Sequence, residues 1–219
     1  MQRISTRCNF ESAKTIKMFE SFLTSIEQNR LLILETTGAF LTLWCVYLAA
    51  KNKISNWPVS MIASVVYFFV FYINRLFSDA YLQIIFLLFQ TYGWWFWSNY
   101  NTIKSEKTIS SIKKKEMIVL IGIGTLAYII WYSIYIKINV NARYPSIDSL
   151  CTIISLLALF MQAKHWIENW LVWIFVDLIY VPLYALSDQI VTGGLYVVLI
   201  ILAIKGYLDW KKQIQTTVS

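Results

Sequence analysis

The sequence predicts an all-α integral membrane protein in which two three-helix repeats flank a linker helix. The first observation is composition. Of the 219 residues, 58% are hydrophobic and only 14% are charged, against roughly 25% charged residues in a soluble domain. The second observation is that the apolar residues run in blocks of about 20, the length that crosses the hydrocarbon core of a bilayer. The third is an internal repeat.

The apolar blocks predict seven membrane spans. They cover residues 31–50, 56–74, 80–100, 117–138, 147–163, 168–187 and 193–211. The resulting parts are an N-terminal segment (1–30), a first three-helix repeat (31–100), a polar link with the linker span (101–146), a second three-helix repeat (147–212) and a C-terminal tail (213–219). The N-terminal segment has apolar residues on one helical face but also lysines and glutamates. We expect it to be an amphipathic helix at the membrane interface, with an eighth span as the alternative.

Positive charge gathers on one side of this predicted topology. The links and tails on that side contain Lys51, Lys53, Lys104, Lys107, Lys113, Lys114, Lys115, Lys164, Lys211 and Lys212. The other side has little beyond Arg75, Lys137 and Arg143. Because lysine and arginine mark the cytoplasmic side of a membrane protein, we expect the C-terminus in the cytoplasm. The net charge of +7 thus reflects orientation, and no nucleic-acid partner is expected.

The two repeats align without a gap, from about residue 41 to residue 100, when the chain is shifted by 113 residues. The matched pairs include Lys51 with Lys164, Trp57 with Trp170, Gly93 with Gly206, and Trp97 with Trp210. A single linker span leaves both repeats in the same orientation. The sequence therefore predicts a parallel repeat about an axis along the membrane normal, an arrangement that occurs in transporters.

Polar and aromatic residues recur at spacings of three and four within the spans, which places them on shared helical faces. Asp177 is the most informative, because a carboxylate costs roughly 2.5–3.5 kcal/mol to insert and normally faces a cavity or a partner. Gln90 can donate and accept hydrogen bonds at once, although glutamine also joins helices for structural reasons. The candidate substrate-binding residues are Ser64, Tyr67, Gln90, Trp94, Trp173, Asp177, Tyr180, Tyr184 and Tyr207. Helix packing is the alternative role for each of them.

Five further residues receive structural interpretations. Trp97 and Trp210 lie near the predicted cytoplasmic ends of their spans, where an interfacial tryptophan belt is the ordinary explanation. Gly93 and Gly206 are expected to permit close helix approach. The only histidine, His165, is expected to be solvated in a cytoplasmic link. No catalytic residue, metal or cofactor is expected, because no metal-ligand cluster, phosphate loop or Ser/His/Asp set is present in the sequence.

Two long segments carry a family resemblance. NWPVSMIASVVYFFVFYINRLFSDAYLQIIFLLFQTYGWWFW and NWLVWIFVDLIYVPLYALSDQIVTGGLYVVLIILAIKGYLDW resemble the PnuC-type nicotinamide riboside transporters, over about residues 31–212. The resemblance implies a 3+1+3 core similar in plan to the SWEET sugar transporters, a bacterial inner-membrane location and a homotrimer. It also implies uptake of an unphosphorylated NAD precursor by facilitated diffusion, with the two bundles rocking against each other. A cytoplasmic kinase, which need not touch the transporter, would then trap the substrate.

The candidate residues suit that substrate chemically. Its cationic pyridinium ring would be attracted to the aromatic faces of Trp94, Tyr180 and Tyr184. Gln90 would pair with the carboxamide, and Asp177 with the ribose hydroxyls or the positive ring. The lack of a basic cluster at mid-membrane disfavours a phosphorylated nucleotide. The alternatives are a carrier of thiamine or riboflavin on the same fold, a non-transporting receptor or scaffold, and a membrane enzyme.

Overall fold

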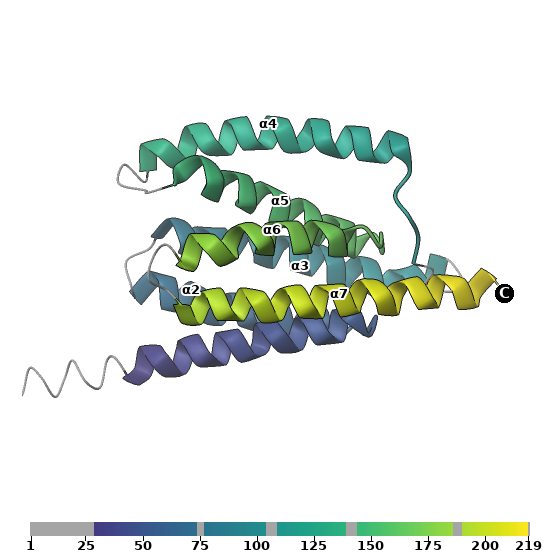
Figure 1. Cartoon of the computed structure of the whole chain (residues 1–219), viewed down its shortest axis with the longest axis horizontal. Helices are drawn as coiled ribbons and strands as arrows, with labels where there is room; N and C mark the ends of the chain where they lie inside the picture. The colour runs from purple at the N-terminus through teal and green to yellow at the C-terminus, as the bar shows by residue number, and fades with distance from the viewer. Residues whose placement is uncertain (1–28, 74–76, 104–108, 139–143, 186–189, 219) are drawn as a thin grey trace, which may run out of the picture.

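The computed structural model describes residues 29–73, 77–103, 109–138, 144–185 and 190–218. The described residues form an N-terminal helix, Asn29–Ala50, and six labelled helices (Figure 1). These are α2 (Asn56–Ile73), α3 (Phe77–Ile103), α4 (Lys114–Ile138), α5 (Pro145–Ala163), α6 (Asn169–Ala185) and α7 (Ile190–Val218). Five of the helices are long and apolar enough to cross a membrane, and α6 is a shorter apolar helix. The predicted all-α membrane class is confirmed, while the amphipathic helix expected before residue 29 lies outside the described residues.

The helices run side by side, with α4 at one edge of the bundle and the N-terminal helix at the opposite edge (Figure 1). Within each predicted repeat the last two helices pack closely, α2 against α3 and α6 against α7. The helix α5 contacts α3 and α6 and so joins the two halves, whereas α4 contacts α5. Most of α4 is exposed and apolar, as a peripheral linker helix in lipid would be. This arrangement fits the predicted 3+1+3 plan.

The turns that follow the first helix of each half have the same geometry. Asn52 and His165, which are 113 positions apart, both adopt positive φ angles, of 53° and 56°. In each turn the residue at positive φ and the residue after it donate backbone hydrogen bonds of 2.9–3.0 Å to carbonyls three and five positions earlier. This is the Schellman arrangement that ends a helix. Its recurrence at equivalent positions supports the predicted duplication.

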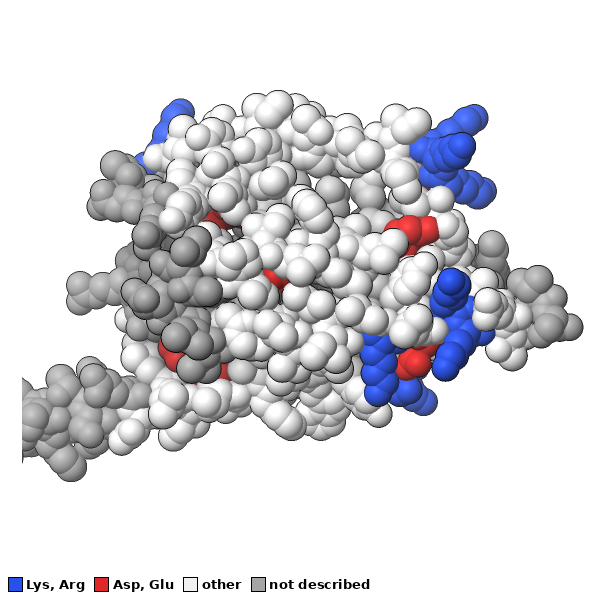
Figure 2. Space-filling model, viewed as in Figure 1, with Lys and Arg blue, Asp and Glu red and all other residues white. Residues whose placement is uncertain are grey.

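The described basic residues are distributed unevenly. Figure 2 shows lysine and arginine side chains gathered at the end of the molecule where the C-terminus lies. The lysines in the described links and helix ends there are Lys51, Lys53, Lys113, Lys114, Lys115, Lys164, Lys211 and Lys212. Arg30 and Lys137, at the start of the N-terminal helix and the end of α4, lie at the opposite end. We call the lysine-rich end the basic end.

The basic end also contains a cluster of buried aromatic rings, which we call the tryptophan clasp: Trp57, Trp97, Trp170, Trp210 and His165. All five side chains are at most 1% exposed. The predicted interfacial belt is therefore wrong for Trp97 and Trp210, and the predicted solvated state of His165 is wrong as well. The His165 ring stacks on Trp97 with 4.1 Å between ring centroids. His165 follows the end of a helix in a lysine-containing link, and nothing in the local sequence indicates that its side chain is buried.

Two glycines make room for the clasp. A methyl group added at Gly206 would lie 2.7 Å from the Trp170 ring, and one added at Gly93 would overlap the Trp57 ring. The predicted close approach at both glycines is thus present, with an indole as the neighbour. The recurring Gly-x-x-x-Trp frame has two jobs. Its glycine leaves space for an indole ring of the same half, and its tryptophan donates a hydrogen bond to a backbone carbonyl of the other half.

Candidate functional site

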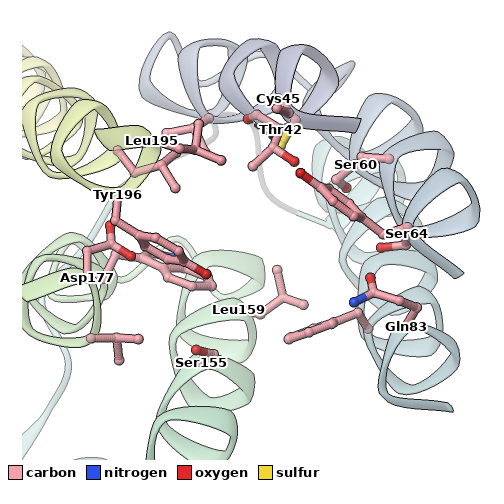
Figure 3. A pocket seen from close by; sticks show the side chains of 18 of the residues that line it. Thr42, Cys45, Ser60, Ser64, Gln83, Ser155, Leu159, Asp177, Leu195 and Tyr196 are labelled. Atoms are coloured by element: carbon pink, nitrogen blue, oxygen red, sulfur yellow. Dashed lines mark hydrogen bonds between the residues drawn. The ribbon is translucent and has the colours of Figure 1, made fainter. Parts of the chain in front are cut away.

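A cavity of about 960 Å³ lies between the two halves. Its lining comes from the N-terminal helix, α2, α3, α5, α6 and α7 (Figure 3). This volume falls at the upper end of the roughly 300–1,000 Å³ that is typical of small-molecule sites. It extends to the basic end of the molecule, where Ala49, Asn56 and Trp170 are part of the lining.

The first half supplies hydroxyl and amide groups to the cavity. The Gln90 Nε2 donates a hydrogen bond of 2.9 Å to the Ser64 Oγ, and the same hydroxyl lies 3.2 Å from the Gln90 Oε1. Both side chains are buried. Ser60 and Gln83 lie on the same side of the cavity (Figure 3). This wall can donate and accept hydrogen bonds but has no charge of its own at these positions.

The second half supplies aromatic rings and a carboxylate. Asp177 is only 4% exposed, and it has no hydrogen bond or ion pair with any other residue that the structure describes. The rings of Tyr180 and Tyr196 lie 4.8 Å apart, and Trp173 lines the same wall. Figure 3 shows Asp177 and Tyr196 across the cavity from Ser64 and Gln83. An unpaired carboxylate beside aromatic faces favours a ligand with positive charge.

Residues at equivalent positions of the two repeats form the two walls, but their side chains differ in chemistry. Shifted by 113 residues, Ser60 corresponds to Trp173, Ser64 to Asp177, Gln83 to Tyr196, and Gln90 to Ala203. All eight residues line the cavity. The duplication therefore builds a symmetric frame, and these four substitutions make its contents asymmetric. An asymmetric ligand with one charged aromatic end and one hydrogen-bonding end matches such a site.

The charged side chains in the described lining are acidic. Asp177 and Glu35 both line the cavity, and none of the described lining residues is a lysine, arginine or histidine. Sites that bind phosphate groups in proteins use arginine, lysine or helix N-termini to neutralise the charge. The described lining offers neither an arginine nor a lysine side chain for this purpose. Nor do three His, Cys, Asp or Glu side chains come together as a possible metal site among the described residues.

The structure brings six of the nine predicted site residues to the cavity. Those six are Ser64, Tyr67, Gln90, Trp173, Asp177 and Tyr180. Trp94 is 44% exposed and outside the lining, and Tyr207 is also outside it. Four residues of an α-helix turn about 400°, so Trp94 is rotated away from the direction of Gln90. The side chain of Tyr184 lies outside the described part of the chain.

Sequence reasoning missed the contribution of α5. Thr152, Ser155, Leu159 and Gln162 line the cavity from this helix, at spacings of three and four that could have identified a face. The Gln162 Nε2 donates a hydrogen bond of 3.2 Å to the Asn56 Oδ1 at the start of α2. Small hydroxyl residues are common in packed membrane helices, which is why the pattern on α5 was not distinctive.

A cavity between two three-helix halves of a membrane protein is the architecture of a small-solute transporter. The family model described as nicotinamide mononucleotide transporter matches residues 32–212, and the chain belongs to that family.

Two curated relatives illustrate the range of the family. The chain is 24% identical over 204 residues to the nicotinamide riboside transporter PnuC of Escherichia coli (strain K12), covering 81% of this chain and 84% of the relative. It is 27% identical over 182 residues to the riboflavin/roseoflavin transporter RibM of Streptomyces davaonensis, covering 80% and 83%. The crystal structure of the Vitamin B3 transporter PnuC superposes with a TM-score of 0.63 at 19% identity, covering 84% of this chain and 82% of that one. The structural likeness shows that the fold is shared.

Proposed function

We propose that this protein carries nicotinamide riboside across the membrane. The observation that carries the proposal is the unpaired Asp177 carboxylate, set among aromatic rings in a cavity whose described lining has no basic side chain. Nicotinamide riboside has a permanently positive pyridinium ring, a carboxamide and a ribose. It is a small cation whose aromatic end carries both the positive charge and the carboxamide, while its other end is the ribose.

Each wall is assigned one part of the substrate. Tyr180, Tyr196 and Trp173 stack around the pyridinium ring, where a desolvated cation gains roughly 2 kcal/mol from an aromatic face. Asp177 neutralises the ring or binds the ribose hydroxyls. Across the cavity, the Ser64–Gln90 pair hydrogen-bonds the carboxamide. The Gln90 amide suits that group because it can both donate and accept.

The riboside fits the cavity better than its phosphorylated form, the mononucleotide. A phosphate would bring negative charge next to Asp177 and Glu35, and no basic side chain in the described lining would offset it. Removing a charged phosphate from water without a partner costs several kcal/mol. Phosphorylation in the cytoplasm by a kinase that need not touch the transporter would thus trap the substrate and drive net uptake by facilitated diffusion.

The same proposal includes the cellular setting. The protein resides in a bacterial inner membrane as a homotrimer, with its basic end and C-terminus in the cytoplasm. The lysines at that end support this orientation through the positive-inside rule. Transport proceeds by alternating access, in which the two halves rock about the cavity.

Riboflavin is the second candidate substrate. The likeness to RibM favours it, and the volume of about 960 Å³ leaves room for a larger ring system. Riboflavin is uncharged, however, so it would leave the Asp177 carboxylate without a counter-charge. Thiamine, another aromatic cation, is the third candidate, because the aromatic wall would accept it as well.

Uptake by proteoliposomes tests the proposed function. The purified chain is reconstituted into liposomes and given radiolabelled nicotinamide riboside outside, with nicotinamide mononucleotide, riboflavin or thiamine as competitors. We expect accumulation of the riboside to the external concentration without an ion gradient, and weak competition by the mononucleotide. Flux of riboflavin or thiamine in place of the riboside would keep the fold and change the substrate, and no flux of any of them would favour a receptor or scaffold.

A further inference from the structure

The two halves are joined at the basic end by a reciprocal pair of hydrogen bonds. The Trp97 Nε1, from the first half, donates to the Ala163 carbonyl oxygen at the end of α5, at 3.0 Å. The Trp210 Nε1, from the second half, donates to the Ala49 carbonyl oxygen at the end of the N-terminal helix, also at 3.0 Å. The two tryptophans occupy equivalent positions of the repeat, so each half closes on the other with the same residue.

The other two tryptophans of the clasp stay within their own halves. Trp57 packs edge-on against Trp97 with 5.4 Å between ring centroids, and Trp170 packs edge-on against Trp210 with 5.5 Å. Both rings also rest on the glycine of their own half. A movement of one half relative to the other would leave these contacts intact. It would break the bonds that Trp97 and Trp210 make.

The clasp forms the closed floor of the cavity. Trp170, Asn56 and Gln162 line the cavity at this end, and the rings behind them are at most 1% exposed. The Gln162–Asn56 hydrogen bond also crosses between the halves. On the outer surface, Lys51 pairs with Asp209 at 2.9 Å, again between the halves. A solute in the cavity can leave through the basic end only if these contacts separate.

The closed clasp leaves part of its hydrogen-bonding capacity unused. The indole N–H groups of Trp57 and Trp170 are buried and have no hydrogen-bond partner among the described residues. A buried donor without a partner destabilises the state that contains it by an amount similar to what a hydrogen bond contributes. Closing the clasp therefore makes two indole bonds and leaves two indole donors unpaired. Donors that reach water when the halves separate offset part of the stabilisation that the contacts between the halves give the closed arrangement.

We propose that the tryptophan clasp is the gate on the basic side of the cavity. Trp97 and Trp210, which we call the latches, stabilise the closed gate by their hydrogen bonds to the other half. Trp57 and Trp170, which we call the counterweights, destabilise the closed gate because their buried N–H groups have no partner among the described residues. The proposal rests on the proposed transport function and assigns residues to one of its steps. The proposal predicts the direction of each effect. Phenylalanine at a latch position removes a hydrogen bond and favours the open gate, whereas phenylalanine at a counterweight position removes an unpaired donor and favours the closed gate.

The test measures access to the cavity from the basic side without any substrate. The native Cys45 lines the cavity about one turn before Ala49, and it serves as the reporter after Cys8→Ser and Cys151→Ala. Membrane vesicles of both orientations are treated with a small, cationic, membrane-impermeant methanethiosulfonate, and the labelling rate of Cys45 is followed. One hydrogen bond changes an equilibrium roughly 2- to 12-fold. The Trp97→Phe,Trp210→Phe double variant should thus label at least about fivefold faster from the basic side.

The matched variants decide the interpretation. Trp57→Phe and Trp170→Phe should label no faster than the parent, and Trp95→Phe, on an exposed ring, should not change the rate. Equal acceleration by the latch double variant and by both counterweight variants would overturn the proposal, because it would mean that any loss of ring volume loosens this end. No acceleration by the latch variants would overturn it too.

A cross-link provides a second measurement that survives poor folding of the tryptophan variants. The side chains of Asn52 and Gln213 are in contact across the halves, with 3.4 Å between Nδ2 and Oε1. Asn52→Cys and Gln213→Cys, joined by a short bis-methanethiosulfonate, should abolish riboside flux, and reduction should restore it. Normal flux through the cross-linked protein would overturn the gate. If the parent protein carries no riboside at all, the proposed function fails, while the Cys45 labelling still decides the clasp.

Discussion

Gly206 lies against the face of Trp170, so close that a methyl group in place of its hydrogen would be 2.7 Å from the indole ring. The equivalent Gly93 lies against Trp57 in the same way. In both halves a helix that begins with Asn-Trp thus inserts its indole into a notch on the following helix. This contact makes each half a unit and sets the floor of the cavity.

Gly206→Ala is therefore predicted to destabilise the protein. Overpacking a tight interior contact costs roughly 1–3 kcal/mol, which outweighs the better helix propensity of alanine. Thermal unfolding in detergent should show a lower Tm. The matched control is Gly122→Ala, because nothing lies within 4 Å of that position on α4. A Tm for Gly206→Ala equal to that of the control would contradict the notch.

Asp177→Asn is predicted to weaken binding of nicotinamide riboside by roughly 10- to 100-fold, since a hydrogen bond or contact to a charged group contributes about 1.5–3 kcal/mol. The same substitution should weaken binding of the reduced, uncharged dihydronicotinamide riboside much less. Titration calorimetry of both ligands measures the difference. The control is Asp148→Asn on α5, whose carboxylate accepts a hydrogen bond from the Tyr135 hydroxyl outside the cavity lining. Equal losses for the two ligands would mean that Asp177 does not sense the ring charge.

Gln90→Leu is predicted to reduce affinity for the riboside about tenfold, because it removes the amide and leaves the buried Ser64 hydroxyl without its partner. Ser64→Ala should reduce it less. In the double variant the losses should be clearly non-additive, since the two side chains act as one hydrogen-bonded unit. Thr91→Ala is the neighbouring control, because the Thr91 hydroxyl donates a hydrogen bond to the Leu87 carbonyl of its own helix. Additive losses would show that the pair does not act as one unit.

Glu168→Ala is predicted to loosen the link that leads into α4. The Glu168 carboxylate accepts hydrogen bonds from the Ile112 backbone N–H, at 3.0 Å, and from the Ser111 hydroxyl. These bonds hold the link against the turn that contains His165, to which Ser110 is also hydrogen-bonded. Limited trypsin digestion should cleave after Lys113–Lys115 several-fold faster in the variant. Cleavage at the parental rate would show that the backbone pairing suffices.

The all-α membrane class could be predicted, and six of the nine candidate residues do line the cavity, because both depend on local patterns. Blocks of apolar residues define membrane helices, and Asp177 is conspicuous in such a block. The tryptophans were harder, because an indole near a helix end suits the membrane interface and a buried cluster equally well. Trp97 and Trp210 are each buried between a tryptophan of their own half and the end of a helix from the other half. His165 is buried for the same reason, and no local pattern reports it.

The predicted cavity face of α3 was right at Gln90 and did not hold at Trp94. The helical spacing of four places two residues near each other on the surface but rotates the second by about 40°. Where the cavity wall is a single helix, that rotation is enough to turn a side chain from the cavity to the outer surface. Only the packing of α2 against α3, set by Trp57 and Gly93, fixes which residue faces inward.

The central claim is that the cavity selects an unphosphorylated, positively charged nucleoside. Isothermal titration of the detergent-purified protein with nicotinamide riboside and, separately, with nicotinamide mononucleotide tests it most directly. The arrangement of Asp177 and Glu35 in a lining whose described residues include no basic side chain predicts micromolar or tighter binding of the riboside and at least about 100-fold weaker binding of the mononucleotide. Equal or tighter binding of the mononucleotide would contradict the claim.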